Sequence, residues 1–264
     1  MAVDVKQLDQ ILDRCGKIIK RHIPDQAVRL DFESKIYSGG LTQALLLVNN
    51  YLPKKESLIL DIGCGKGHIS VLLASLGYSV HAIDIEETKG EQLEISEKKW
   101  QQSIWTDLEK AYPHFNLKYQ FYNGIKIPFQ NESFDGVMAY AVIEHAANYV
   151  NFLIEANRVL KKGGQLFIFR CPRKQSGMEY AAQLLKMSHH EKLMDEKELE
   201  EALRTTGFQK IRMEISDLVP AFPPAKLQRL WNDNSKIINL ADKTLLKSPL
   251  KHIAHHMNFV CNKI

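Results

Sequence analysis

The stretch from Leu58 to Gly67, which reads LILDIGCGKG, is the feature that most constrains how this chain can fold. An apolar run ends in an acid, Asp61, and glycines follow at every second position: Gly63, Gly65 and Gly67. Glycine tolerates positive φ and lets a ligand approach the main chain closely. We therefore predict a strand, a tight turn and a helix N-terminus, the arrangement that holds a charged small molecule over backbone N–H groups. The structural alternative is a glycine-rich turn without a ligand.

The charge of the turn bears on which ligand it could hold. A dinucleotide-binding fingerprint reads GxGxxG, whereas the third glycine of this turn, Gly67, arrives one residue early. Asp61 is poorly matched to a pyrophosphate, because both are anionic. The acid suits a ligand that carries a positive ammonium or sulfonium group.

The rest of the chain alternates between strand-like and helix-like segments. We predict seven strands, at 57–62, 78–84, 117–122, 134–140, 165–171, 208–215 and 255–261. The helices between and after them are expected at 67–76, 89–111, 149–160, 176–187, 195–206, 225–232 and 235–246, and Lys161 to Gly164 are expected to close the third of these. Strands that alternate with helices indicate a parallel sheet covered on both faces. The predicted fold class is α/β, a doubly wound, mostly parallel seven-stranded sheet.

Two further helices are predicted before the first strand, at 4–22 and within 41–51, from apolar residues at helical spacing. We divide the chain into an N-terminal helical cap at 1–52 and a main domain at 53–264. Within the main domain, 172–192 is a candidate lid and 216–250 is a helical insertion before the last strand, over the active site.

Composition excludes several classes of protein. The 264 residues suffice for one large domain with a full core, and the net charge of +4 is too mild to indicate a nucleic-acid partner. No apolar run approaches the ~20 residues that span a bilayer, and we see no signal-peptide pattern at the N-terminus. The four cysteines lack CxxC pairing, so we predict no metal site, no disulfide and a cytoplasmic location.

Two later strand ends carry residues that could bind a nucleoside. Asp84, followed by Ile85, ends the second predicted strand, which lies beside the glycine turn in a doubly wound sheet. A carboxylate there can accept hydrogen bonds from both hydroxyls of a ribose. After the third strand, the Asn123 oxygen could accept a hydrogen bond from an adenine amino group, and the Gly124 N–H could serve a ring nitrogen. The alternatives are a helix cap at Asp84 and a plain Asn-Gly turn.

The fourth predicted strand ends in Tyr140 and Ala141, whose carbonyl groups could receive an ammonium group. Glu144 and His145 follow, and they are the titratable side chains nearest to where a reacting group would sit. A histidine with a pKa near neutrality could act as a general base. The alternative for His145 is local packing or hydrogen bonding only.

Together these motifs resemble the class I S-adenosylmethionine-dependent methyltransferases, and most closely the small-molecule branch that includes the ubiquinone and menaquinone methyltransferases. LDIGCGKG at 60–67 is similar to the family's first motif, and Asp84 falls on its ribose-binding acid. IPFQNESFDGVMAYAVIEH at 127–145 and RVLKKGG at 158–164 match the later motifs in order and spacing. The chain departs from many relatives at Asn123, where they have Asp, and in its long 216–250 insertion.

The resemblance implies a Rossmann-like methyltransferase fold with S-adenosylmethionine as the cofactor. It places cofactor contacts at Tyr37, Asp61, Gly63, Cys64, Gly65, Gly67, Asp84, Ile85, Asn123, Gly124, Tyr140 and Ala141. An acceptor hydroxyl of high pKa would need a base, for which His145, His189 and His190 are candidates. We predict His145 and His189 as the catalytic residues.

The acceptor is expected to enter over the carboxyl ends of the fourth and fifth strands. Apolar and basic residues are mixed in the 216–250 insertion, which fits a small acceptor that is apolar or anionic. The alternative is a helical subdomain that packs only its own core. Arg170, Arg173 and Lys174 are either cations at the mouth of the site or solvated surface charges.

Two other functions stay open beside a small-molecule methyltransferase: methylation of RNA or protein, and an accessory role that uses the cofactor without catalysis. We see no added RNA-binding domain and no (D/N)PP(Y/F) tetrapeptide of the kind found in methyltransferases of nucleic-acid amino groups. Peripheral contact with a membrane is compatible with an apolar acceptor. The sequence indicates neither the acceptor nor the oligomeric state.

Overall fold

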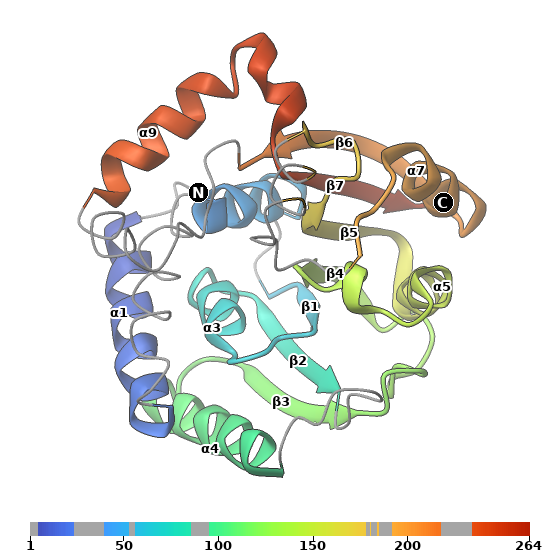
Figure 1. Ribbon diagram of the computed structural model, residues 1–264. Coiled ribbons are helices and arrows are strands. Elements are labelled where there is room, and N and C mark those ends of the chain that lie inside the picture. The colour runs from blue at the N-terminus through green and yellow to red at the C-terminus, as the bar shows by residue number, and fades with distance from the viewer. Residues whose placement is uncertain are drawn as a thin grey trace.

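One seven-stranded sheet organises the molecule (Figure 1). The computed structural model describes residues 5–23, 40–52, 56–85, 95–177, 180, 184, 192–217 and 234–264. The strands are β1 (Leu58–Ile62), β2 (Ser79–Ile85), β3 (Leu117–Tyr122), β4 (Phe134–Tyr140), β5 (Leu160–Pro172), β6 (Phe208–Ser216) and β7 (His256–Lys263). Their order is β3-β2-β1-β4-β5-β7-β6, and only β7 runs antiparallel to its neighbours. The predicted fold class is confirmed.

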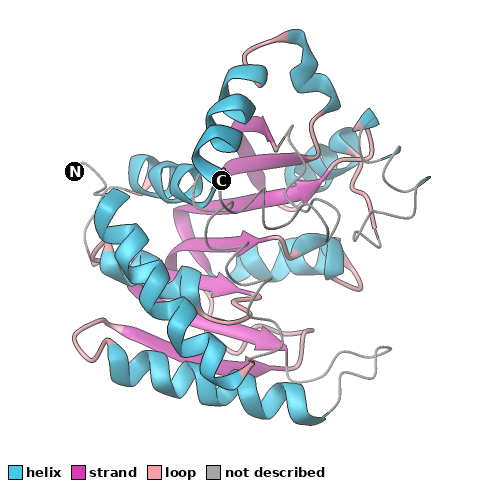
Figure 2. Ribbon diagram, turned by 60° about the vertical axis from the view of Figure 1, so that its left-hand side comes forward, coloured by secondary structure: helices cyan, strands magenta, loops and turns pink. Residues whose placement is uncertain are grey.

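Helices cover both faces of this sheet (Figures 1 and 2). One face carries α1 (Val5–His22), a helix over 40–51, α3 (His68–Ser75) and α4 (Ile95–Ala111). The other face carries α5 (Tyr149–Val159) and α7 (Glu196–Thr205), and α9 (Ser235–Leu245) lies apart at one end of the sheet. Two short 3-10 helices, η2 (Ile143–His145) and η4 (Pro249–Ile253), were not predicted.

Local chemistry explains where several helices begin. The Asn148 side chain accepts hydrogen bonds from the N–H groups of Val150 and Asn151, and Asp195 caps α7 in the same way. Such caps satisfy N–H groups that have no partner inside the helix. Where the structure describes them, predicted and observed element bounds agree within a few residues, except that β5 begins at Leu160 and not at 165. The predicted helix at 225–232 and most of that at 176–187 lie outside the described residues.

The prediction that Lys161 to Gly164 close the 149–160 helix is wrong. Helix α5 ends at Val159, and Leu160 is already extended and pairs with Phe134 of β4. Regular pairing resumes with Gln165 opposite Gly136, so the residues between form an irregularity at the start of β5. Gly163 takes a φ of 73° there. The glycines therefore shape a strand and not a helix end.

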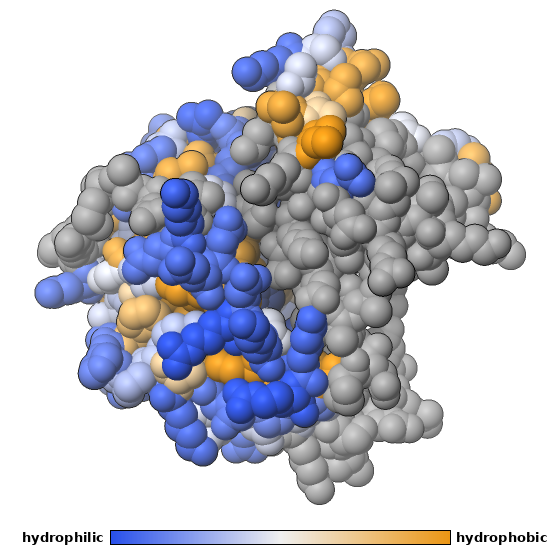
Figure 3. Space-filling view, turned by 90° about the vertical axis from the view of Figure 1, so that its left-hand side faces the viewer, coloured by the Kyte–Doolittle hydropathy of each residue, from blue (hydrophilic) through white to orange (hydrophobic). Residues whose placement is uncertain are grey.

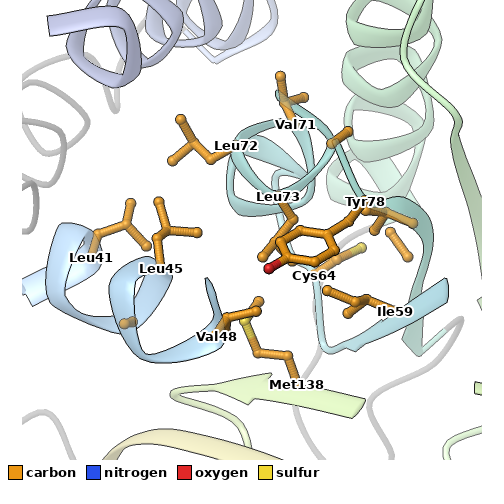
Figure 4. Close-up of a cluster of buried hydrophobic side chains, with 14 of the residues drawn as sticks. Leu41, Leu45, Val48, Ile59, Cys64, Val71, Leu72, Leu73, Tyr78 and Met138 are labelled. Atoms are coloured by element: carbon orange, nitrogen blue, oxygen red, sulfur yellow. The ribbon is translucent and has the colours of Figure 1, made fainter. Parts of the chain in front are cut away.

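The N-terminal helices belong to the main hydrophobic core. Leu41, Leu45 and Val48 of the 40–51 helix point toward Leu73, Tyr78 and other side chains of the β1–α3 unit (Figure 4). Buried residues of α1 belong to the same hydrophobic cluster. Side chains on the face of the molecule that carries α1 are largely hydrophilic (Figure 3). The division into a cap at 1–52 and a domain at 53–264 stays a prediction.

Candidate cofactor and acceptor site

The glycine turn between β1 and α3 has the strained backbone that its sequence predicts. Gly63, Gly65 and Gly67 have φ values of 71°, 52° and 82°. A Cβ atom on Gly63 would lie 2.5 Å from Val142, and one on Gly67 would lie 2.7 Å from Tyr119. A side chain at either position would meet both an unfavourable φ and a steric clash. Glycine is therefore required at Gly63 and Gly67 by the backbone geometry and the close packing.

Most N–H groups of the turn are already used within the protein. Gly63 and Cys64 donate to the Ile83 carbonyl oxygen at 2.8 and 3.1 Å, and Gly67 donates to Cys64. Gly65 donates to Asp84 Oδ2 at 2.6 Å. A pyrophosphate needs such groups free to cradle its oxygens. These four N–H groups therefore have partners within the protein, which supports the argument against a dinucleotide, and the binding of a ligand at the turn stays a prediction.

Three side chains that sequence reasoning missed hold the turn in place. Gln101 Nε2 and Trp105 Nε1 both donate to the Gly65 carbonyl oxygen at 2.9 Å, and the Tyr119 hydroxyl donates to that of Gly67 at 2.7 Å. Trp105 also stacks on Tyr119, with 5.3 Å between ring centroids. These contacts join residues 36 to 52 positions apart, so no local motif could have revealed them.

Asp61 is buried beneath the turn, with 2% of its surface exposed. The Ser70 hydroxyl of α3 donates to its Oδ2 at 2.6 Å. Burial raises the pKa of the Asp61 carboxyl to about 7, although this hydrogen bond acts in the opposite direction. Burial also raises the pKa of the neighbouring Cys64 thiol well above its ordinary value. Cys64 is therefore a neutral part of the wall and not a nucleophile.

Asp84 ends β2 beside the turn, as predicted. One carboxylate oxygen accepts from Gly65 and the other from the Ile85 N–H, at 2.7 Å. Burial raises the pKa of the carboxyl, and these hydrogen bonds act against the shift. A carboxylate has about four acceptor sites, so two hydroxyl groups could still bind. The geometry fits the ribose role, which stays a prediction.

The Asn123–Gly124 pair forms a turn at the end of β3. Asn123 is exposed, and its Oδ1 accepts from the N–H groups of Ile125 and Lys126, both at 3.0 Å. A Cβ on Gly124, whose φ is 71°, would lie 2.9 Å from Ile85 Cγ2. The ends of β2 and β3 therefore form one wall. The prediction that Asn123 and Gly124 form a turn is confirmed. The contact of the Asn123 side chain with adenine stays a prediction.

The end of β4 reaches the glycine turn through Val142. Ala141 has a φ of 54°, and its N–H donates to the Phe169 carbonyl oxygen at 2.9 Å. In the η2 helix that follows, the His145 side chain is 59% exposed, whereas that of Glu144 is 2% exposed. His145 Nε2 and Glu144 Oε1 lie 3.9 Å apart. The exposed histidine and its buried neighbour sit at the edge where an acceptor is expected.

Arg170 and Arg173, predicted as cations at the mouth of the site or as solvated surface charges, are both buried, whereas Lys174 is exposed. Arg170 Nε lies 3.5 Å from Asp217 Oδ2, which also lies 2.9 Å from His256 Nδ1. Arg173 Nη2 lies 3.4 Å from a carboxylate oxygen of Glu196. These arginines are parts of buried ion pairs. Of the remaining predicted site residues, Tyr37, His189 and His190 lie outside the described residues.

Comparison with known proteins places this geometry in a family. Residues 60–168 match the family model described as "Methyltransferase domain". An O-methyltransferase of Aspergillus sclerotiorum is 29% identical over 157 residues, which cover 57% of this chain and 54% of that protein. A ubiquinone biosynthesis O-methyltransferase of Roseobacter denitrificans is 26% identical over 208 residues, which cover 75% and 77%. The chain thus spans from about half to three quarters of the length of these relatives.

Over residues 60–168 the chain is therefore similar to a family of S-adenosylmethionine-dependent methyltransferase domains. The cofactor of this family is S-adenosylmethionine. A phosphoethanolamine N-methyltransferase of Haemonchus contortus in complex with that compound shares the fold, with a TM-score of 0.56 and 21% identity over 84% of this chain and 52% of that one. The [4+2]-cyclase SpnF shares it as well, with a TM-score of 0.60 and 17% identity over 84% and 80%. The fold alone therefore does not decide the reaction.

Two general features of the chain complete the description. All four cysteines are buried and free. Among the helices that the structure describes, none is both long and apolar enough to cross a membrane.

Proposed function

We propose that this protein transfers the methyl group of S-adenosylmethionine to a hydroxyl group of a small, largely apolar molecule. The observation that carries the proposal is the carboxylate of Asp84, held by the Gly65 N–H beside a turn in which the N–H groups of Gly63, Cys64 and Gly67 are also occupied. Such a site favours a ribose and a cationic group over a phosphate. The O-methyltransferase names of the two relatives support oxygen as the methylated atom.

The proposed cofactor contacts run along the carboxyl ends of four strands. Asp84 would bind the ribose hydroxyls, and Ile85 with the Asn123–Gly124 turn would flank the adenine. The methionine end would lie over the first strand and the end of β4, near Asp61, Gly63, Cys64, Gly65, Gly67, Tyr140 and Ala141, with Tyr37 as a further contact. Asp61 would then supply negative charge below a positive ligand.

The bound cofactor supplies an electrophilic methyl group, so the protein need not build an activated donor. The tasks of the chain are to align the acceptor oxygen with that methyl group, to exclude water and to receive the proton. His145 and His189 are the proposed bases.

Exposed apolar side chains favour an apolar acceptor or a lipid-associated one. Ile237 and Leu240 of α9 are each 67% exposed, and hydrophobic atoms gather on the protruding end of the molecule (Figure 3). Lys247 and Lys251 are exposed nearby. Apolar residues among lysines suit peripheral contact with an anionic membrane surface. A cytoplasmic location and the absence of a nucleic-acid partner remain parts of this proposal.

Calorimetry with S-adenosylhomocysteine tests the cofactor site. Asp84→Ala should weaken binding by about 1–3 kcal/mol, because hydrogen bonds to a charged carboxylate are lost. Glu109→Ala, an exposed acid on α4, is the matched control and should leave the affinity unchanged. Equal affinities for Asp84→Ala and the unmodified protein would refute the ribose assignment.

A labelled-methyl assay tests the acceptor class. Transfer into the small-molecule or lipid fraction of a cell extract is the expected result. Transfer only into RNA or protein would contradict the proposed acceptor, and tight cofactor binding without any transfer would favour an accessory role.

A further inference from the structure

The middle glycine of the turn, Gly65, has one open side and one side that helix α4 holds. Among the described residues, no atom lies within 4 Å of the position that a Cβ on Gly65 would take. The same atom on Gly63 or Gly67 would clash with a neighbouring side chain. A ligand can therefore approach the turn closely at Gly65, whereas the other two glycines are packed against the protein.

Two side chains of α4 occupy both lone pairs of the Gly65 carbonyl oxygen. Gln101 Nε2 and Trp105 Nε1 each donate to this oxygen at 2.9 Å. The two residues are four positions apart, so their side chains lie on the same face of the helix. A carbonyl oxygen has two lone pairs, and both are used here. Since the Gly65 N–H is bound to Asp84, the peptide groups on both sides of Gly65 are held in place.

Trp105 holds this face of α4 against the sheet. The residue is buried, its ring stacks on Tyr119, and the Phe121 ring lies 4.5 Å away in a tilted arrangement. Tyr119 in turn donates to the Gly67 carbonyl oxygen. These three aromatic residues therefore join α4, β3 and the turn, and they fix where the amide of Gln101, one helical turn before Trp105, can lie.

Gln101 links the glycine turn to the acid that ends β2. Besides donating to the Gly65 carbonyl oxygen, its side chain hydrogen-bonds the Asp84 carboxyl. A glutamine amide has two N–H donors, so one amide group can serve both acceptors. Asp84 thus has three partners from three segments, namely the Gly65 N–H, the Ile85 N–H and the Gln101 side chain. A ligand hydroxyl can reach the carboxylate only on the side that these partners leave open.

The hydrogen bond from Gln101 also favours the charged form of Asp84. Burial raises the pKa of this carboxyl, and the hydrogen bonds from Gly65, Ile85 and Gln101 each act to lower it. Hydrogen bonds to an ionised acceptor are roughly twice as strong as those between neutral groups. Loss of the Gln101 donor would therefore weaken both the orientation and the ionisation of the carboxylate.

We propose that Gln101 is a positioning residue of the cofactor site, which holds the Asp84 carboxylate and the Gly65 carbonyl oxygen in the arrangement that receives the ribose. This inference rests on the proposed function, in which Asp84 binds the ribose hydroxyls. The effect of Gln101 on the ribose passes through Asp84. Because the folded chain already orients the carboxylate, cofactor binding does not have to order it, and preorganisation of this kind increases affinity.

Calorimetry with S-adenosylhomocysteine compares variants of α4 with the unmodified protein. Gln101→Met keeps the length of the side chain but removes its hydrogen bonds, and it should weaken binding by about 3- to 30-fold. Gln101→Glu keeps the shape but cannot donate, so it should bind at least as weakly. Trp105→Phe loses only a bond to the Gly65 carbonyl oxygen and should have a smaller effect. Gln102→Met, the same change at the exposed neighbouring position, should leave the affinity unchanged.

A double-mutant cycle shows whether Gln101 acts through Asp84. In the Asp84→Ala background, Gln101→Met should change the affinity by less than about twofold, because the group that it positions is gone. Trp105→Phe should keep its effect in the same background, since it does not contact Asp84 in this network. If Gln101→Met weakened binding equally in both backgrounds, Gln101 would act independently of Asp84 and the inference would be overturned.

The 2′,3′-dideoxy analogue of S-adenosylhomocysteine gives a readout that a purely structural role would not change. The unmodified protein should prefer the ligand with the complete ribose, and this preference should shrink in Gln101→Met by about the factor that the affinity loses. Trp105→Phe and Gln102→Met should keep the full preference. An undiminished preference in Gln101→Met would show that the residue does not support ribose recognition.

These measurements separate failure of the inference from failure of the proposed function. If Asp84→Ala binds S-adenosylhomocysteine normally, the ribose assignment itself is wrong and the proposed function fails first. If Asp84→Ala binds weakly and Gln101→Met binds normally, only the role of Gln101 is refuted. Gln101→Met should melt within about 3 °C of Gln102→Met, which would show an intact fold, and Gln101→Glu takes its place in every comparison if it does not.

Discussion

Asp61 and Asp217 are both acids at the carboxyl edge of the sheet, but their neighbours differ. Asp61, in the half that holds the glycine turn, has the neutral Ser70 hydroxyl as its hydrogen-bond partner, and burial raises its pKa to about 7. Asp217, in the other half, also meets a burial cost. Arg170 and His256 overcome that cost and hold the pKa of Asp217 well below its usual range.

The difference between Asp61 and Asp217 indicates which half of the sheet is suited to bind a positively charged ligand. Around Asp217 the protein supplies its own cations, so the pair is complete without a bound molecule. Around Asp61 a positive ligand would supply the missing charge and favour ionisation of the acid. Glu144 stands between these cases, since it lies near Arg170 but makes no hydrogen bond.

Arg170→Met should have the largest effect on stability. Removing one partner of a buried ion pair leaves an uncompensated charge and costs about 3–5 kcal/mol, measurable by urea unfolding at neutral pH. At pH values above the ordinary pKa of an aspartate, the lowered pKa of Asp217 stabilises the fold. This stability is lost as the pH falls through the pKa of Asp217 in the folded state. The difference in stability between the two proteins should therefore shrink as the pH falls below about 4.

The control for this prediction is Arg204→Met. Arg204 pairs with Glu201 at 2.6 Å, but their side chains are 71% and 59% exposed. Exposed pairs contribute about 0–1 kcal/mol, so this variant should unfold almost normally. If Arg170→Met and Arg204→Met lowered the free energy of unfolding equally, the Arg170–Asp217 pair would contribute no more to stability than an exposed pair.

Gly63→Ala should have the second-largest effect on stability. The new Cβ would combine a φ of 71° with a contact of 2.5 Å to Val142, for a cost of about 2–4 kcal/mol and loss of S-adenosylhomocysteine binding. Gly163→Ala is the matched control, because its φ is 73° and nothing lies within 4 Å of the added atom. The control should lose only about 1–2 kcal/mol and bind normally.

Asp61→Asn should have a smaller effect that depends on pH. Because the folded-state pKa of Asp61 is raised, the folded protein binds more protons than the unfolded chain, and stability falls as pH rises toward about 7. Relative to the unmodified protein, the variant should gain roughly 2 kcal/mol between about pH 5.5 and pH 8. Unfolding curves at both pH values check this, and parallel pH dependences would mean that Asp61 is ionised throughout.

Local sequence was sufficient to predict the sheet and to place the proposed cofactor residues at its carboxyl edge. Strand β1, its acid and the three glycines follow from an apolar run and a turn, and Asp84 follows from the regular alternation of strands and helices. Parallel strands bring their carboxyl ends to one edge, so the residues at these ends meet without further information. The prediction that Lys161 to Gly164 close a helix was wrong because glycine after a helix is also compatible with an irregular start of a strand.

Only the tertiary structure decided which charges are exposed and which are buried. Arg170 meets Asp217 and His256 through a bulge and two antiparallel strand pairs, and Trp105 reaches Gly65 from a helix 40 positions away. Glu144 and His145 are neighbours in the sequence, yet one is buried and the other exposed. Sequence periodicity reports the faces of one element at a time, whereas burial and pKa depend on every element that packs around a side chain.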